Sequence, residues 1–183
     1  MPDTTHTVVP EGGGRRGAPR ILIAGLGNEV LRDDGVGVHA ARLLAGDADR
    51  TLRVVAVGTA VIDALHLFEW ADIVLAIDAM QAGGRPGTVY HCATDDVLHP
   101  GMDVSLHELS LTGALRLLDA EGSTPRAYVL GVEPGLIDYG LDLTAPVASA
   151  LPRVVRSARR MIADWRAGRA DVPATVSRRR ETP

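Results

Sequence analysis

Five short runs of apolar residues along the chain predict β-strands. The third run, Ile73–Asp78, reads IVLAID and is apolar until its final aspartate. Such a run is typical of a strand that helices cover on both faces. The five predicted strands are Arg20–Ala24, Leu52–Val57, Ile73–Asp78, Thr88–His91 and Ala127–Val132.

Apolar residues at helical spacing occur between these strands and after the last of them. The longest such stripe runs from Val147 to Trp165 at steps of three and four, with arginines on the opposite face. Shorter stripes are Val36, Ala40, Leu43 and Leu44; Ile62, Leu65 and Phe68; and Leu111, Leu115 and Leu118. The alternation predicts an α/β fold with three layers, in which helices flank a twisted, mostly parallel five-stranded sheet. The tight GGRPG connection at 83–87 indicates that the fourth strand is an antiparallel edge strand.

Length and composition favour one ordinary globular domain. The 183 residues are 46% hydrophobic and 23% charged. We expect a flexible N-terminal extension over 1–19, a single α/β domain over 20–167 and a flexible basic tail over 168–183, because both ends lack apolar periodicity.

Net charge and cysteine content limit the kinds of binding partner and the cellular compartment that we expect. The net charge of -4 gives no indication of nucleic acid or a membrane surface as a partner. The single cysteine, Cys92, excludes an internal disulfide and a cysteine-rich metal site. We find neither a secretory signal nor an apolar run of about 18 residues, so we expect a cytoplasmic protein.

Candidate chemistry gathers where the predicted strands end. Asp33 and Asp34 follow the first strand and its glycine turn, and Asp78 ends the third strand. Open α/β folds place their sites at this carboxyl edge of the sheet, where we also expect His107. Carboxylates and an imidazole together suit a borderline divalent metal ion. Glu133, at the end of the fifth strand, is a minor candidate for orienting a substrate.

Each of these residues also has an ordinary structural interpretation. Asp33 or Asp34 could cap the helix that begins near Gly35. Asp78 could accept hydrogen bonds from the next turn, and a lone histidine such as His107 is commonly just a polar surface or half-buried residue.

Two other motifs do not support a site. The GLGN segment departs from the G-x-G-x-x-G dinucleotide fingerprint, so Gly25 and Gly27 are better explained by a sharp turn. His91 and Cys92 are neighbours on a predicted strand and point to opposite faces, so they cannot form a catalytic dyad.

Several motifs together match a known family. They are GLGNEVLRDDGVG at the first strand, IDAM around Asp78, GGRPGTVY, SLHELSL around His107, and VLGVEP. In order and spacing they resemble the nickel–iron hydrogenase maturation proteases over roughly residues 20–166. The resemblance implies an endopeptidase that removes the C-terminal extension of the hydrogenase large-subunit precursor once nickel is in place.

The resemblance also implies roles for individual residues. The family's nickel ligands fall on Asp34, Asp78 and His107 of this chain, and Asp34 and Asp78 are the implied catalytic residues. The nickel would be supplied by the precursor, so the free protein would not need to carry it.

One position departs from the family pattern. Many members have an aspartate where this chain has Ala56, in the segment Ala56–Val57–Gly58–Thr59. This departure leaves open an alternative in which the protein binds the precursor as a catalytically silent nickel-checking module. A nucleotide-binding domain is a third interpretation, which the failed glycine fingerprint disfavours.

Overall fold

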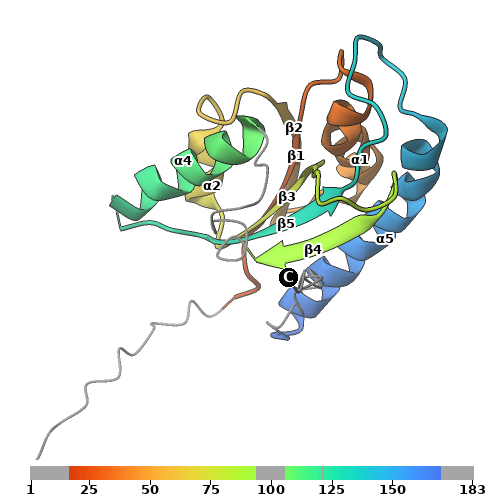
Figure 1. The fold of residues 1–183 in the computed structure, drawn as a ribbon. Helices are drawn as coiled ribbons and strands as arrows, with labels where there is room; N and C mark the ends of the chain where they lie inside the picture. The colour runs from red at the N-terminus through yellow and green to blue at the C-terminus, as the bar shows by residue number, and fades with distance from the viewer. Residues whose placement is uncertain (1–16, 94–105, 121, 170–183) are drawn as a thin grey trace, which may run out of the picture.

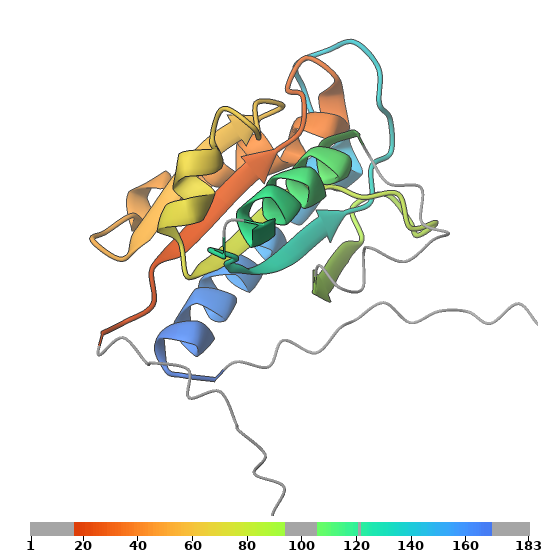
Figure 2. The same cartoon turned by 90° about the vertical axis from the view of Figure 1, so that its left-hand side faces the viewer.

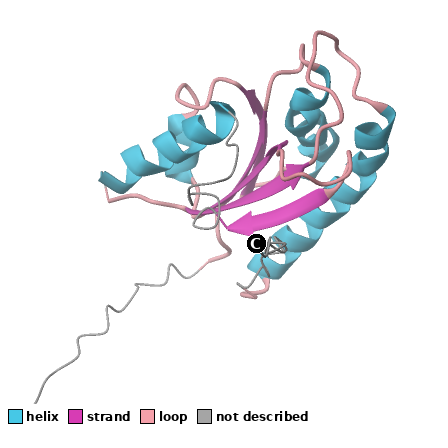
Figure 3. Ribbon diagram, viewed as in Figure 1, coloured by secondary structure: helices cyan, strands magenta, loops and turns pink. Residues whose placement is uncertain are grey.

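A computed structural model describes residues 17–93, 106–120 and 122–169, and for 106–110 it describes the backbone alone. The predictions for residues 1–16 and 170–183 therefore lie outside the described residues. The chain forms a twisted sheet with helices on both faces (Figures 1 and 3). The strands are β1 (Ile21–Leu26), β2 (Leu52–Gly58), β3 (Ile73–Ala79), β4 (Val89–Ala93) and β5 (Arg126–Val132). The longer helices are α1 (Val36–Leu44), α2 (Leu65–Trp70), α4 (Leu106–Ala120) and α5 (Ala145–Arg166).

The strand order confirms the predicted fold class. The five strands are arranged β2-β1-β3-β5-β4. β1, β2, β3 and β5 are parallel, whereas β4 pairs antiparallel with β5 at one edge of the sheet. The predicted strand positions hold to within two residues at each end.

Alternating residues of each strand divide the core into two halves. On β3, Ile73, Leu75 and Ile77 pack with α1 and α5. Val74 and Ala76 pack on the other face, in the half of the core that contains residues of α2 and α4. Figure 2 shows α2 and α4 side by side over this second face. This alternation fixes the face to which each residue at the end of β3 belongs.

Two residues of the predicted apolar stripes are exposed. Leu43 is 55% exposed because its neighbour Leu44 occupies the inward position of α1. Ile62 is 56% exposed because α2 begins only at Leu65, so helical spacing does not apply at residue 62. In the described part of the chain, no helix is both long enough and apolar enough to cross a membrane.

Candidate functional site

The first loop of the chain brings Asp34 and Asp78 to one turn. Gly27, directly after β1, has a φ of 101°, which favours glycine. A Cβ atom at Gly27 would lie 1.8 Å from the backbone oxygen of Asp34 and 3.3 Å from Oδ1 of Asp78. The two aspartates therefore approach the same glycine from different elements, and no larger residue fits between them.

Asp34 lies in a one-turn 3₁₀ helix, Arg32–Gly35, that leads into α1. Its side chain is buried, and its Oδ2 accepts a hydrogen bond of 2.8 Å from the backbone N–H of Asn28. This bond holds the Asp34 carboxylate against the turn that follows β1.

Asp78 is the last residue but one of β3 and lies on the face that α2 and α4 cover, because it continues the alternation of Val74 and Ala76. Its side chain is buried, and its Oδ1 accepts a hydrogen bond of 2.8 Å from the backbone N–H of Ala79. This donor is the last residue of β3 and not part of the next turn, so acceptance of hydrogen bonds from that turn stays a prediction.

Asp33 has a different role from its neighbour Asp34. Its Oδ2 accepts hydrogen bonds from the backbone N–H groups of Gly135 and Leu136 at 2.8 and 2.9 Å. The backbone N–H of Thr144 donates to Oδ1 and its hydroxyl donates to Oδ2, both at 2.7 Å. Burial opposes ionisation of Asp33, but these hydrogen bonds outweigh it and hold the pKa below its ordinary value.

The prediction that Asp33 or Asp34 caps α1 is wrong. The N-cap positions of the 3₁₀ helix and of α1 are Leu31 and Gly35, and neither makes a side-chain cap hydrogen bond. Asp33 instead fastens the segment between β5 and α5 to the first loop. Figures 1 and 2 show these two segments side by side at the carboxyl edge of the sheet.

Glu133 supports a neighbouring loop. Its Oε2 accepts hydrogen bonds from the backbone N–H groups of Ala82 and Gly84 and, at 2.6 Å, from the hydroxyl of Tyr90. Burial and this carboxylate raise the pKa of Tyr90 to about 12, so the phenol remains a donor. These contacts are made with the chain itself, and a substrate-orienting role for Glu133 stays a prediction.

His107 lies in the first turn of α4, and its side chain is outside the described residues. α4 is followed after a short connection by the amino end of β5, so it begins near the carboxyl edge of the sheet (Figure 2). It also covers the face that carries Asp78. Among side chains that the structure describes, no three of the His, Cys, Asp or Glu type form a group that could hold a metal ion. The set Asp34, Asp78 and His107 stays a prediction.

The remaining candidates lie apart from this edge. Cys92 is buried in the half of the core shared with α4, so His91, its neighbour on β4, belongs to the opposite face, as expected. Burial lowers the pKa of His91. Ala56 is exposed on the edge strand β2, in register with Gly25, whose Cβ position is directed at Gly37 and Ala41 of α1. A side chain at position 56 therefore belongs to the face opposite that of Asp78.

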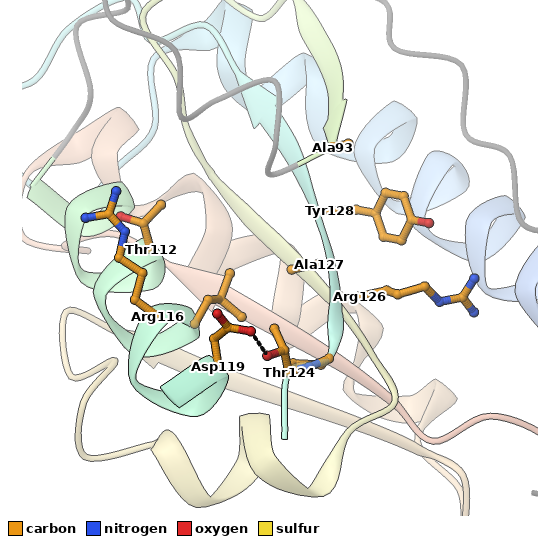
Figure 4. A pocket seen from close by; sticks show the side chains of 10 residues that line it. Ala93, Thr112, Arg116, Asp119, Thr124, Arg126, Ala127 and Tyr128 are labelled. Atoms are coloured by element: carbon orange, nitrogen blue, oxygen red, sulfur yellow. Dashed lines mark hydrogen bonds between the residues drawn. The ribbon is translucent and has the colours of Figure 1, made fainter. Parts of the chain in front are cut away.

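A cavity of about 540 Å³ opens at the other end of the sheet. Figure 4 shows Thr112, Arg116 and Asp119 of α4 on one side of it and Arg126, Ala127 and Tyr128 of β5 on the other. These β5 residues are the first of the strand, whereas Asp34 follows β1 and Asp78 lies at the carboxyl end of β3. The cavity is therefore separate from the acidic site.

The strand order explains why the acidic site lies where it does. β1 is connected through α1 to β2 on one side, and the chain then crosses to β3 on the other side of β1. Open α/β sheets bind their ligands at such a switch point, outside the carboxyl ends of the strands. The fold and site thus define an open α/β protein with two buried carboxylates, Asp34 and Asp78, at its switch point.

Comparison with known proteins identifies the family. The family described as HycI, hydrogenase maturation protease, matches residues 38–161, which include Asp78 and His107. Hydrogenase expression/formation protein HupD of Rhizobium leguminosarum bv. viciae is 30% identical over 154 residues, which cover 81% of this chain and 76% of that protein. HoxM of Azotobacter vinelandii is 33% identical over 154 residues, which cover 80% and 74%.

Solved structures agree. The [NiFe] hydrogenase maturation protease HybD from Thermococcus kodakarensis has a TM-score of 0.68 at 27% identity and covers 78% of this chain and 99% of its own. HybD from E. coli, at 23% identity, shares the fold with a TM-score of 0.72 over 79% of this chain and 93% of its own. This chain belongs to the hydrogenase maturation proteases and is therefore a peptidase.

Proposed function

We propose that this peptidase removes the C-terminal extension of a nickel–iron hydrogenase large-subunit precursor that already holds its nickel, and that it does so in the cytoplasm. Family membership supports the class of reaction and the kind of partner. The structural observation that supports the proposal is at Gly27, at the switch point of the sheet. The backbone oxygen of Asp34 and the carboxylate of Asp78 both lie beside this glycine.

The proposed ligands for the nickel of the precursor are Asp34, Asp78 and His107. Both side chains are buried beside the same turn, and a divalent cation brought by the substrate would offset the cost of burying two carboxyl groups there. Carboxylate and imidazole ligands suit nickel. The start of α4, near the same edge and over the face of Asp78, supports the inclusion of His107. A precursor without nickel would lack this contact, so docking would act as a checkpoint.

Cleavage would depend on aspartate. Hydrolysis adds a water molecule to the scissile carbonyl carbon and breaks the C–N bond. Asp34 or Asp78 takes a proton from that water and returns it to the departing amine. The nickel in the precursor would polarise the water or the scissile carbonyl.

The test is the intact mass of the precursor, nickel-loaded or nickel-free, after incubation with this protein. We expect a discrete C-terminal loss in the loaded sample only. Asp78→Asn and His107→Gln should abolish the loss, whereas Asp63→Asn, the same chemical change at an exposed position, should leave it intact. Cleavage by a variant that lacks all three proposed ligands would rule out the site assignment.

The silent module is the contrasting outcome of the same experiment. Stable complex formation without any mass change would support it, and restoration of cleavage by Ala56→Asp would then identify the missing carboxylate as the cause. Position 56 is exposed, so this substitution should be tolerated by the fold.

A further inference from the structure

Large apolar side chains are exposed together beside the candidate site. Tyr139 is 82% exposed and Leu141 is 66% exposed. Leu136, Ile137 and Val30 are each exposed by more than two fifths. We call these five residues the apolar loop surface. Other large apolar residues exposed in the described part of the chain, such as Leu43 and Leu117, lie singly on helices. Clusters of this kind on an ordered backbone are typical of binding surfaces.

Backbone hydrogen bonds join the two halves of this surface. The N–H of Gly140 donates to the oxygen of Val30, and the N–H of Arg32 donates to the oxygen of Gly140, both at 2.9 Å. The carboxylate of Asp33 holds the N–H groups of Gly135 and Leu136. The surface is therefore preorganised, which lowers the entropy cost of binding.

The same bonds fix the surface relative to the candidate site. Asp33 is bonded to the 135–144 segment and is covalently joined to Asp34. The backbone N–H of Asp34 also donates to the oxygen of Leu31, the neighbour of Val30. The apolar loop surface is therefore held next to the loop that carries Asp34.

We propose that the apolar loop surface docks the folded body of the protein substrate, next to the segment that is cut. This inference rests on the proposed function, which makes the occupant a hydrogenase precursor. Exposed Asp138 and Asp142 alternate with the apolar side chains, so the partner should present an apolar patch with basic residues at its rim. The same aspartates disfavour a second copy of this chain, whose symmetric contact would bring like charges together.

The test compares two double variants of the full chain. Tyr139→Ser with Leu141→Ser removes the centre of the apolar loop surface, and Leu43→Ser with Leu117→Ser removes exposed leucines on α1 and α4. Cleavage kinetics are measured with the nickel-loaded precursor from the same organism. Binding is measured by biolayer interferometry with the same precursor. We expect the first variant to raise KM and Kd by about tenfold or more with kcat nearly unchanged, and the second to match the wild type.

The outcomes separate this inference from the proposed function. Wild-type cleavage with an unaltered KM in the Tyr139 and Leu141 variant would overturn the docking surface and leave the proposed function standing. Precursor binding that depends on this surface, without any cleavage, would overturn the proposed function and leave the surface standing. A wild-type dimer, seen by light scattering and lost in the variant, would assign the surface to a second copy and overturn the inference. Unchanged thermal unfolding of both variants shows that the fold is intact.

Discussion

Four hydrogen bonds converge on the carboxylate of Asp33, and all of their donors lie more than 100 residues further along the chain. Its neighbour Asp34 accepts instead from Asn28, within the same loop. The two neighbouring aspartates therefore differ in role: Asp33 stabilises the fold, and Asp34 is a candidate site residue. Nothing in the local sequence distinguishes the two, because the partners that decide the role of Asp33 lie far along the chain, beyond β5.

Asp33→Asn should destabilise the protein. The amide would place an NH₂ group among donors that now meet a carboxylate oxygen, and hydrogen bonds to charged groups contribute about 1.5–3 kcal/mol each. We expect the free energy of unfolding in urea to fall by about 2 kcal/mol or more. Asp138→Asn, an exposed change on the same segment, is the matched control and should have little effect.

The pH dependence of this difference follows from the lowered pKa of Asp33. A carboxylate with a lowered folded pKa stabilises the protein fully above its unfolded pKa of about 4 and loses that contribution as the pH falls through the folded pKa. The gap between wild type and Asp33→Asn should therefore be constant at neutral pH and shrink below about pH 4. An equal gap at all pH values would show that the charge of Asp33 does not contribute.

At the scale of elements, apolar periodicity was sufficient to predict every strand of the sheet. The runs around Ile23, Leu75 and Leu130 are long enough to fix both the strand and its burial, since parallel strands are covered on both faces. Periodicity could not predict the segment 133–144, because an irregular loop has no repeating apolar position. That segment carries the partners of Asp33 and most of the apolar loop surface. The sequence therefore did not reveal the contact between the first loop, which carries Asp33, and the segment 133–144.

The turn after β1 offers a prediction at the scale of elements, at Gly27. A Cβ there would meet the backbone oxygen of Asp34 at 1.8 Å, and the φ of 101° disfavours any L side chain. Gly27→Ala should cost about 3 kcal/mol or more, because backbone strain and overpacking add. Gly113→Ala is the control: it lies on an exposed part of α4 with open space around it and should stabilise by roughly 0.5–1 kcal/mol. Thermal or urea unfolding measures both, and an equal effect of the two changes would contradict the crowding of the turn.

At the scale of the whole molecule, the switch point and the 135–144 segment bring two kinds of recognition to one edge. In the proposed function, Asp34 and Asp78 would bind a nickel ion in the substrate, whereas the exposed Tyr139 and Leu141 would contact its folded body. The carboxyl edge of the sheet could be located from the sequence, because strands that alternate with helices end together there. Which residues on that edge share one turn depends on the packing of α1 against β1 and β3, which no sequence motif specifies.

These two kinds of recognition should contribute separately to binding. Distant groups without shared partners usually have additive effects on free energy. The double variant at Tyr139 and Leu141 should weaken binding of nickel-loaded and nickel-free precursor by the same factor, about tenfold. Asp78→Asn should instead leave the nickel-free precursor unaffected and abolish the advantage of the loaded one.

A double-mutant cycle tests this additivity. Biolayer interferometry measures the binding of loaded and unloaded precursor to the wild type, to each of the two variants and to their combination. Asp63→Asn is the control for the charge-neutralising change, since Asp63 is exposed on the turn before α2. A nickel preference that persists in Asp78→Asn would remove Asp78 from the recognition of the metal. An effect of the Tyr139 and Leu141 variant on the loaded precursor alone would show that the two contacts form one coupled site, in which the metal must be engaged before the apolar loop surface can be used.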